Sequence, residues 1–197
     1  MVICETKSIS DFRQFIQKLD SNQFQEMILE KNQINRDAFK YAILARKEDI
    51  AIYLLTELSK LESFGFHVDM PDYDGKTALI HAAFLNLTKV VETLLTYGAN
   101  VNRFDWNGQT PLMHATMKGN TKIVELLLDK GAISSIADKA GNTAYDFTKY
   151  RDDIAKILTE NDFNLLLNIV KDYHPRKNDE AIRLIKILPA TKLDQLM

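Results

Sequence analysis

Two histidines occupy the positions in this sequence that come nearest to a site for chemistry. His81 and His114 lie 33 residues apart in matching surroundings, LIHAA and LMHAT. A zinc ion shared between them would need ring nitrogens about 2 Å away and a third protein ligand. Neighbouring helices pack about 8–10 Å apart, and no third ligand is obvious in the nearby sequence. We therefore expect packed or hydrogen-bonded histidines, with no metal and no cofactor.

Other catalytic patterns are missing from the sequence. Cys4 has no histidine near it, His67 falls in a predicted turn, and His174 falls in a predicted loop between two terminal helices. The chain contains no GxxxxGK[ST], no HExxH and no GxSxG motif. We expect a protein that is not an enzyme.

The two histidines are equivalent because residues 72–104 and 105–137 are two copies of one 33-residue unit. Aligned without gaps, 14 positions of the two copies are identical. Self-similarity at a fixed period of this size indicates an array of stacked repeats. The elements that position the histidines are therefore expected to recur along the chain.

Each copy has the composition of two short helices after a turn. Thr110, followed by a proline, predicts a capped helix start. Gly119 in one copy and Asn86 in the other predict a left-handed residue that ends this helix. Gly98 and Gly131 stand where a second helix would end. The unit therefore predicts a turn, a helix, a short loop and a second helix.

Through G-x-T-P-L and the later V-x-x-L-L-x-x-G-A, the chain resembles the ankyrin repeat family. The resemblance implies an all-α fold, a solenoid of stacked helix pairs with protruding turns. Ile80 and Met113 fill the slot where the family's T-P-L-H motif has a histidine, which puts the histidine-to-turn hydrogen bonds in question. The fold is still expected, because a hydrogen bond contributes about 0.5–1.5 kcal/mol and each buried aliphatic side chain about 1.5–3 kcal/mol.

The flanking segments predict further repeats and caps. Residues 1–35 are expected to form a helical cap, with helices that begin at Ser10 and Ser21. Residues 36–71 predict a repeat whose second helix is elongated; an inserted loop is the alternative. Residues 138–158 predict a shortened repeat. Residues 159–197 predict a C-terminal helical cap, with helices over 161–173 and 178–188.

Composition narrows the class of protein. The 197 residues are 46% hydrophobic and 26% charged, with a net charge of −2 and one cysteine. Lys/Arg and Asp/Glu numbers are nearly equal in residues 1–71, 72–158 and 159–197, so a nucleic-acid partner is not expected. No apolar run approaches the roughly 18 residues of a membrane span, and no secretory signal is visible. We expect a monomer in a reducing, cytoplasmic compartment.

The resemblance to ankyrin repeats also implies which residues meet a partner. In that family these are the turn positions around G-x-T and two positions late in the first helix. Carried over to this sequence, the candidates are Tyr73, Asp74, Lys76, Phe84, Leu85, Phe104, Asp105, Trp106, Asn107, Gln109, Met117, Lys118, Lys139, Asn142, Tyr150 and Arg151.

The aromatic members of this set suggest one patch made by Tyr73, Phe84, Phe104, Trp106 and Met117, since exposed apolar surface marks contact sites. Two alternatives remain open. Phe104 and Trp106 would pack only on neighbouring turns, and Phe84 and Leu85 would lie under the long helix of the preceding repeat.

Two classes of function follow from the sequence. One is a free-standing adaptor, inhibitor or effector that binds a protein partner. The other is the targeting portion of a larger enzyme or effector whose activity lies beyond residue 197. In its frequent lysine, asparagine and isoleucine residues, the chain is similar to ankyrin effectors of intracellular bacteria. This similarity would imply a host protein as the partner and the host cytoplasm as the location.

Overall fold

The computed structural model describes residues 8–20, 22, 23, 26, 38–59, 68–171 and 178–189. Within these ranges the chain forms helices joined by turns, with no strand. Cys4, His67 and His174 lie outside the described residues.

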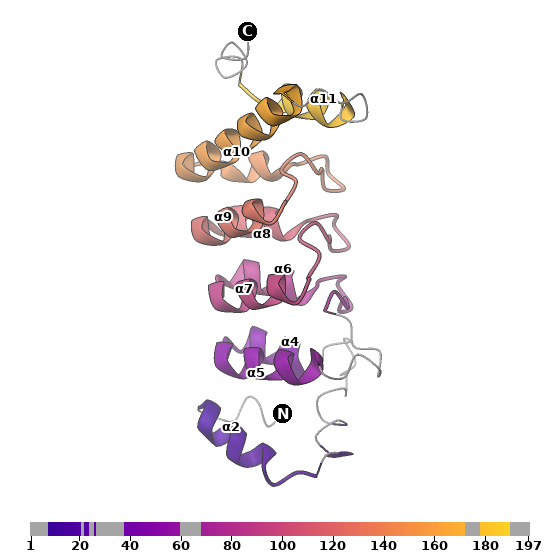
Figure 1. Cartoon of the computed structure of the whole chain (residues 1–197), viewed down its shortest axis with the longest axis vertical. Coiled ribbons are helices and arrows are strands. Elements are labelled where there is room, and N and C mark those ends of the chain that lie inside the picture. Colours follow the sequence, from indigo (N-terminus) through magenta and orange to yellow (C-terminus); the bar gives the residue numbers. More distant parts are fainter. Residues whose placement is uncertain are drawn as a thin grey trace.

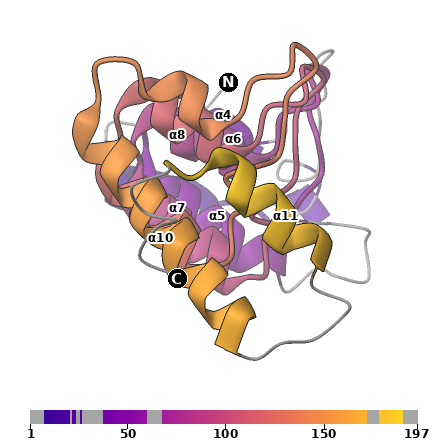
Figure 2. The same cartoon turned by 90° about the horizontal axis from the view of Figure 1, so that it is seen from above.

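Two rows of helices stack into one column (Figure 1). The inner row consists of α4 (Ala38–Leu44), α6 (Ala78–Leu85), α8 (Pro111–Lys118) and the 3-10 helix η2 (Ala144–Thr148). The outer row consists of α5 (Glu48–Ser59), α7 (Thr88–Thr96), α9 (Thr121–Asp129) and α10 (Asp152–Lys171). Each helix packs on its partner and on the next helix of its row. Viewed along the column, the connecting turns gather on one edge beside the inner row (Figure 2). The expected all-α stack of helix pairs is confirmed.

The helix ends of the central repeats follow the local chemistry of the sequence. Thr77 and Thr110 cap α6 and α8, their hydroxyls accepting hydrogen bonds at 3.3 Å from the amides of Ile80 and Met113. At the other end of these helices, Asn86 (φ 61°) and Gly119 (φ 74°) adopt the left-handed conformation.

Aliphatic side chains at helical spacing make a continuous core between the rows. Val90 and Leu94 of α7, and Ile123 and Leu127 of α9, are fully buried. Burial of each such side chain stabilises the fold by about 1.5–3 kcal/mol. Stacking therefore supplies most of the stability that no single repeat could provide.

The N-terminal helix starts earlier than predicted. α2 (Ile9–Ile16) is capped by Ser8, which accepts a hydrogen bond from the Asp11 amide at 3.1 Å, so the predicted cap at Ser10 is wrong. Asp20 and Gln23 exchange reciprocal hydrogen bonds of 2.8 and 3.1 Å, the pattern of a capping box one residue before the predicted Ser21. The rest of the second predicted helix lies outside the described residues.

The first repeat has the longest outer helix before the C-terminal region. α5 contains 12 residues, against nine in α7 and nine in α9. Residues 60–67, where most of the predicted extension falls, lie outside the described residues. The choice between a longer helix and a loop beyond Ser59 stays a prediction.

The C-terminal end differs from the sequence expectation in one respect. α10 runs unbroken through residue 158, where the sequence pattern separates the last repeat from the cap. A single 20-residue helix therefore serves both. α11 (Asn178–Ile187) packs on α10 through Leu184, while Ile185 is 48% exposed. In the part of the chain that the structure describes, no helix is both long and apolar enough to cross a membrane.

Candidate functional site

Three turns, named here the finger turns, precede the inner elements and share one construction. They cover residues 72–77, 105–110 and 138–143. In the second, Asp105 Oδ1 accepts hydrogen bonds from the amides of Asn107 (2.9 Å) and Gln109 (3.0 Å). Asp72 and Asp138 bond the equivalent amides of their own turns. A buried aspartate therefore organises each finger turn from within.

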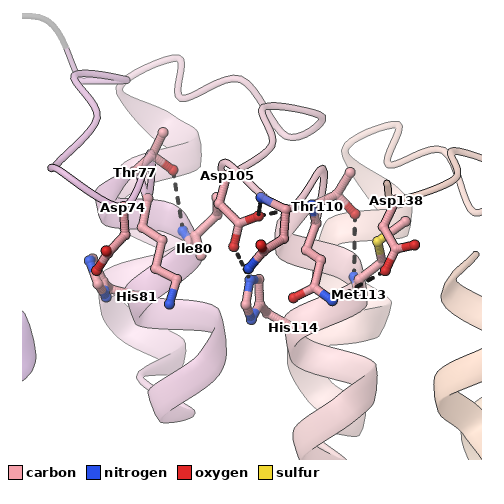
Figure 3. A network of polar contacts seen from close by, with 12 residues as sticks. Asp74, Thr77, Ile80, His81, Asp105, Thr110, Met113, His114 and Asp138 are labelled. Atoms are coloured by element: carbon pink, nitrogen blue, oxygen red, sulfur yellow. Dashed lines mark hydrogen bonds and ion pairs between the residues drawn. The ribbon is translucent and has the colours of Figure 1, made fainter. Parts of the chain in front are cut away.

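The second carboxylate oxygen of the aspartate, Oδ2, is the hydrogen-bond partner of the histidine in each of the two central repeats. His81 Nε2 lies 2.9 Å from Asp72 Oδ2. His114 Nε2 lies 3.0 Å from Asp105 Oδ2 in the same way (Figure 3). Because a carboxylate can only accept, the histidine nitrogen carries the proton. The histidine-to-turn bonds that the sequence put in question are therefore present, made from the position after Ile80 and Met113. Each histidine pairs with its own turn, as expected of hydrogen-bonded histidines.

The pKa of Asp105 shows how strongly this arrangement favours the carboxylate. Burial by itself would raise the pKa, but hydrogen bonds from His114 and from the amides of Gln109 and Asn107 outweigh it and hold the pKa below its usual value. Since Asp105 is 1% exposed and bonded at both oxygens, we leave it out of the candidate surface.

The third finger turn lacks the histidine, because Phe147 stands at its position. The amide groups of Gln109 (3.3 Å) and Asn142 (3.2 Å) bond Asp138 Oδ2 instead. Gln109 and Asn142, both candidates for partner binding, therefore help to hold the third finger turn in place. They are only half-buried, so part of each side chain still faces outward.

Backbone contacts tie each finger turn to the next. The Trp106 amide donates to the Asp74 carbonyl at 3.2 Å, and the Lys139 amide donates to the Asn107 carbonyl at 2.9 Å. Trp106 also donates from its indole nitrogen to the Tyr73 carbonyl at 2.7 Å. The row of fingers is therefore held together by its own hydrogen bonds.

Large aromatic side chains remain exposed on this row. Tyr73 is 73%, Phe104 56% and Trp106 60% exposed. Trp106 thus meets both descriptions left open by the sequence: it packs on the neighbouring finger, and most of its ring surface stays accessible. Asp74, Asn107 and Lys139 lie exposed beside these rings, and Lys76 is half-buried.

At the far end of the inner helices, Phe84 is 37% exposed. Its ring meets the His114 ring edge-on, with centroids 5.8 Å apart, and Lys118 Nζ lies 4.2 Å from the ring centroid. These contacts place Phe84 against the following repeat, whereas the sequence alternative placed it under the preceding one. Leu85 is half-buried, and its carbonyl accepts a hydrogen bond from Arg46 at 2.9 Å.

In the last repeat, the structure changes which residues correspond to those of the preceding repeat, by two positions. Tyr150 has φ 65° and immediately precedes the turn into α10, so it corresponds to Gly119 and not to Met117. Lys149 then corresponds to Lys118, a position that the sequence comparison missed. The position of the two-residue deletion is invisible in the sequence, but the left-handed turn residue locates it.

Comparison with protein families supports this geometry. The model described as "Ankyrin repeats (3 copies)" matches residues 12–105 and 103–169, which together make up more than half of the chain. This protein is an ankyrin repeat protein. No curated protein matches the chain.

Ankyrin repeats are generally protein–protein interaction modules and typically non-catalytic. Among the described residues, no group of three or more histidine, cysteine, aspartate or glutamate side chains could hold a metal ion.

The ankyrin stack carries a second set of side-chain links away from the finger turns. The Asp69 carboxylate accepts a hydrogen bond from the Asn100 amide at 3.0 Å. One repeat later, Asn102 Oδ1 accepts from the Ile133 amide at 2.9 Å. Two rows of links between repeats, one along the fingers and one beside them, hold the inner surface in a fixed shape. A preformed surface loses little freedom when it binds.

Proposed function

We propose that this ankyrin repeat protein binds a protein partner through its finger turns and the ends of its inner helices. In this role it acts as a non-catalytic adaptor, inhibitor or effector. The observation that carries the proposal is the gathering of exposed rings along these elements: Tyr73, Phe84, Phe104, Trp106 and Tyr150. Aromatic side chains dominate the binding energy of protein interfaces.

The rigidity of these rings supports the proposal. Trp106 is fixed by its hydrogen bond to the Tyr73 carbonyl, and Phe84 is fixed between His114 and Lys118. Rings that are held in place yet exposed can bury apolar surface in a complex at a small entropic cost. Met117, which is half-buried, is the one non-aromatic member of the patch that we proposed from the sequence.

We also propose that the protein is a monomer. A reducing, cytoplasmic compartment is proposed as well, supported by the single cysteine of the sequence. If the protein is a secreted bacterial effector, that compartment is the cytoplasm of the host.

The test is affinity capture from cell lysate with the wild type and with a Trp106→Ala/Phe84→Ala double variant, quantified by mass spectrometry. Tyr97→Ala serves as the matched control, because Tyr97 is a 40% exposed ring that follows the outer helix α7. Circular dichroism checks that all three proteins are folded. We expect the captured partner to fall at least tenfold with the double variant only. Equal capture by a folded double variant would refute the proposed surface.

A further inference from the structure

The short turn between the two helices of each repeat contains one left-handed residue. The four residues are Arg46 (φ 56°), Asn86 (φ 61°), Gly119 (φ 74°) and Tyr150 (φ 65°). Glycine adopts this conformation freely, and asparagine is the next most tolerant residue. An arginine or a tyrosine there strains the backbone, so each requires a compensating reason.

For Arg46 the reason lies within the chain, since its guanidinium donates a hydrogen bond to the Leu85 carbonyl at 2.9 Å. Tyr150 has no comparable contact among the described residues. Its side chain is 90% exposed, and the contact recorded for its ring is with Lys149 Nζ, 5.3 Å from the centroid. A strained backbone that presents an exposed ring suggests that the ring serves a contact outside the chain.

Tyr150 belongs to a continuous strip along the ends of the inner elements, named here the inner-edge strip. Lys118 lies over the Phe84 ring, and Arg151 donates to the Met117 carbonyl at 3.1 Å. Arg151 also covers Gly119, where an added Cβ would lie 1.7 Å from its Nη1. The strip thus consists of Phe84, Lys118, Lys149, Tyr150 and Arg151. It crosses two repeat spacings of about 8–10 Å each, the length of five or six extended residues at about 3.3 Å per residue.

The charge of the strip indicates what it would bind. The ammonium groups of Lys118 and Lys149 lie on aromatic rings, and no ion pair with a described carboxylate is recorded for either. The carboxylates nearest in sequence to Lys149 are Asp146, Asp152 and Asp153. Asp146 accepts hydrogen bonds from the Thr143 amide (2.7 Å) and hydroxyl (2.9 Å), and Asp152 and Asp153 lie in the first turn of α10. Asp153 accepts a hydrogen bond from Thr121 Oγ1 at 2.9 Å, which lowers its pKa. Two cations beside two exposed rings fit acidic side chains that alternate with apolar ones.

We infer that the inner-edge strip binds an extended acidic segment of the protein partner, with carboxylates on Lys118 and Lys149 and apolar side chains on Phe84 and Tyr150. This inference rests on the proposed function. A nucleic acid would also offer negative charge, but the repeats carry as many acidic as basic residues and show no basic excess.

The test uses a displayed library of random eight-residue peptides, selected on the full chain. We expect the selected peptides to be enriched in aspartate or glutamate next to leucine or aromatic residues. Tyr150→Gly should bind them at least tenfold more weakly while its unfolding temperature stays the same or rises, because the left-handed strain is relieved. A Tyr150→Gly variant that retains binding would overturn the inference.

A second variant separates charge from folding. Lys118→Glu/Lys149→Glu should lose at least tenfold in affinity for the selected peptides, whereas Lys130→Glu/Lys156→Glu, which alters exposed residues of the outer row, should not. Selected peptides without acidic enrichment would overturn the inference, and so would an oligonucleotide of equal charge that binds as tightly. If capture from lysate fails with Trp106→Ala/Phe84→Ala but survives both strip variants, the proposed function stands and the inference falls.

Discussion

Replacing the glycine of each finger turn with alanine separates backbone strain from the contact between fingers. Gly75, Gly108 and Gly141 occupy equivalent positions with φ of 75°, 81° and 85°. A Cβ added at Gly75 would lie 2.8 Å from the Trp106 amide nitrogen and 2.7 Å from Trp106 Cδ2. At Gly108 the nearest atom would be the Lys139 nitrogen at 3.0 Å, and at Gly141 nothing lies within 4 Å.

The expected magnitudes follow from these contacts. A left-handed alanine costs about 1–2 kcal/mol, and the stiffer unfolded chain returns about 0.4–1 kcal/mol, so Gly141→Ala should destabilise by about 0.5–1.5 kcal/mol. At Gly75 the fingers must also move apart, because the Trp106 nitrogen belongs to the backbone. Both Trp106 hydrogen bonds would lengthen, at about 0.5–1.5 kcal/mol each. Gly75→Ala should therefore cost about 2–4 kcal/mol, with Gly108→Ala between the two.

Urea unfolding followed by circular dichroism measures the three losses. Fluorescence of Trp106, the only tryptophan, reports the finger contact separately. We expect its emission to change with Gly75→Ala and to stay as in the wild type with Gly141→Ala. If the three alanines destabilise equally, backbone strain accounts for the whole effect and the contact between fingers contributes nothing.

Two further predictions concern pH. The folded pKa of Asp105 is lowered, so its stabilisation is present above the unfolded pKa of about 3.9 and is lost as pH falls through the folded value. Asp105→Asn should therefore lose about 1–3 kcal/mol near neutral pH, and the loss should shrink in acid; a constant loss in urea titrations across pH would contradict this. Asp162 accepts hydrogen bonds from Ser134 and from Tyr145 Oη (2.9 Å). Its contribution to stability depends on pH in the opposite direction to that of Asp105, because burial raises the folded pKa of Asp162. Its contribution is full below the unfolded pKa and is lost as pH rises through the folded value, so the stability of the wild type relative to Asp162→Asn should decline as pH rises from the unfolded pKa of about 3.9 through the raised folded pKa; a rising difference would disprove the assignment.

The helix boundaries of the central repeats could be predicted because they depend on local chemistry. Thr77 and Thr110 cap helices through a side chain three residues from its partner, and Asn86 and Gly119 end them through their own backbone preference. Ser10 failed as a cap because Ser8, two residues earlier, offers the same hydroxyl to a helix start. Sequence alone does not rank two equivalent caps.

The candidate site could be predicted only in part, because burial depends on packing between repeats. Asp105 resembles a surface residue in the sequence, yet two backbone amides and His114 draw its carboxylate inward. Gln109 and Asn142 likewise have a structural role, because Phe147 stands where the two preceding repeats have a histidine and the two side-chain amides bond Asp138 instead. The hydrogen bond from Gln109 to Asp138 crosses from one repeat to the next, so a comparison of aligned repeats does not reveal it.

Tyr150 shows where local preference and fold disagree. At the other helix-to-helix turns, the left-handed residue is a glycine, an asparagine, or an arginine whose side chain bonds the next repeat. A sequence that specifies one structure has local choices that agree with it, and exceptions concentrate at functional sites. Relief of the strain by glycine should leave the stack at least as stable, so a binding role for Tyr150 predicts that affinity and stability change in opposite directions. A purely structural role for the ring would make both fall together.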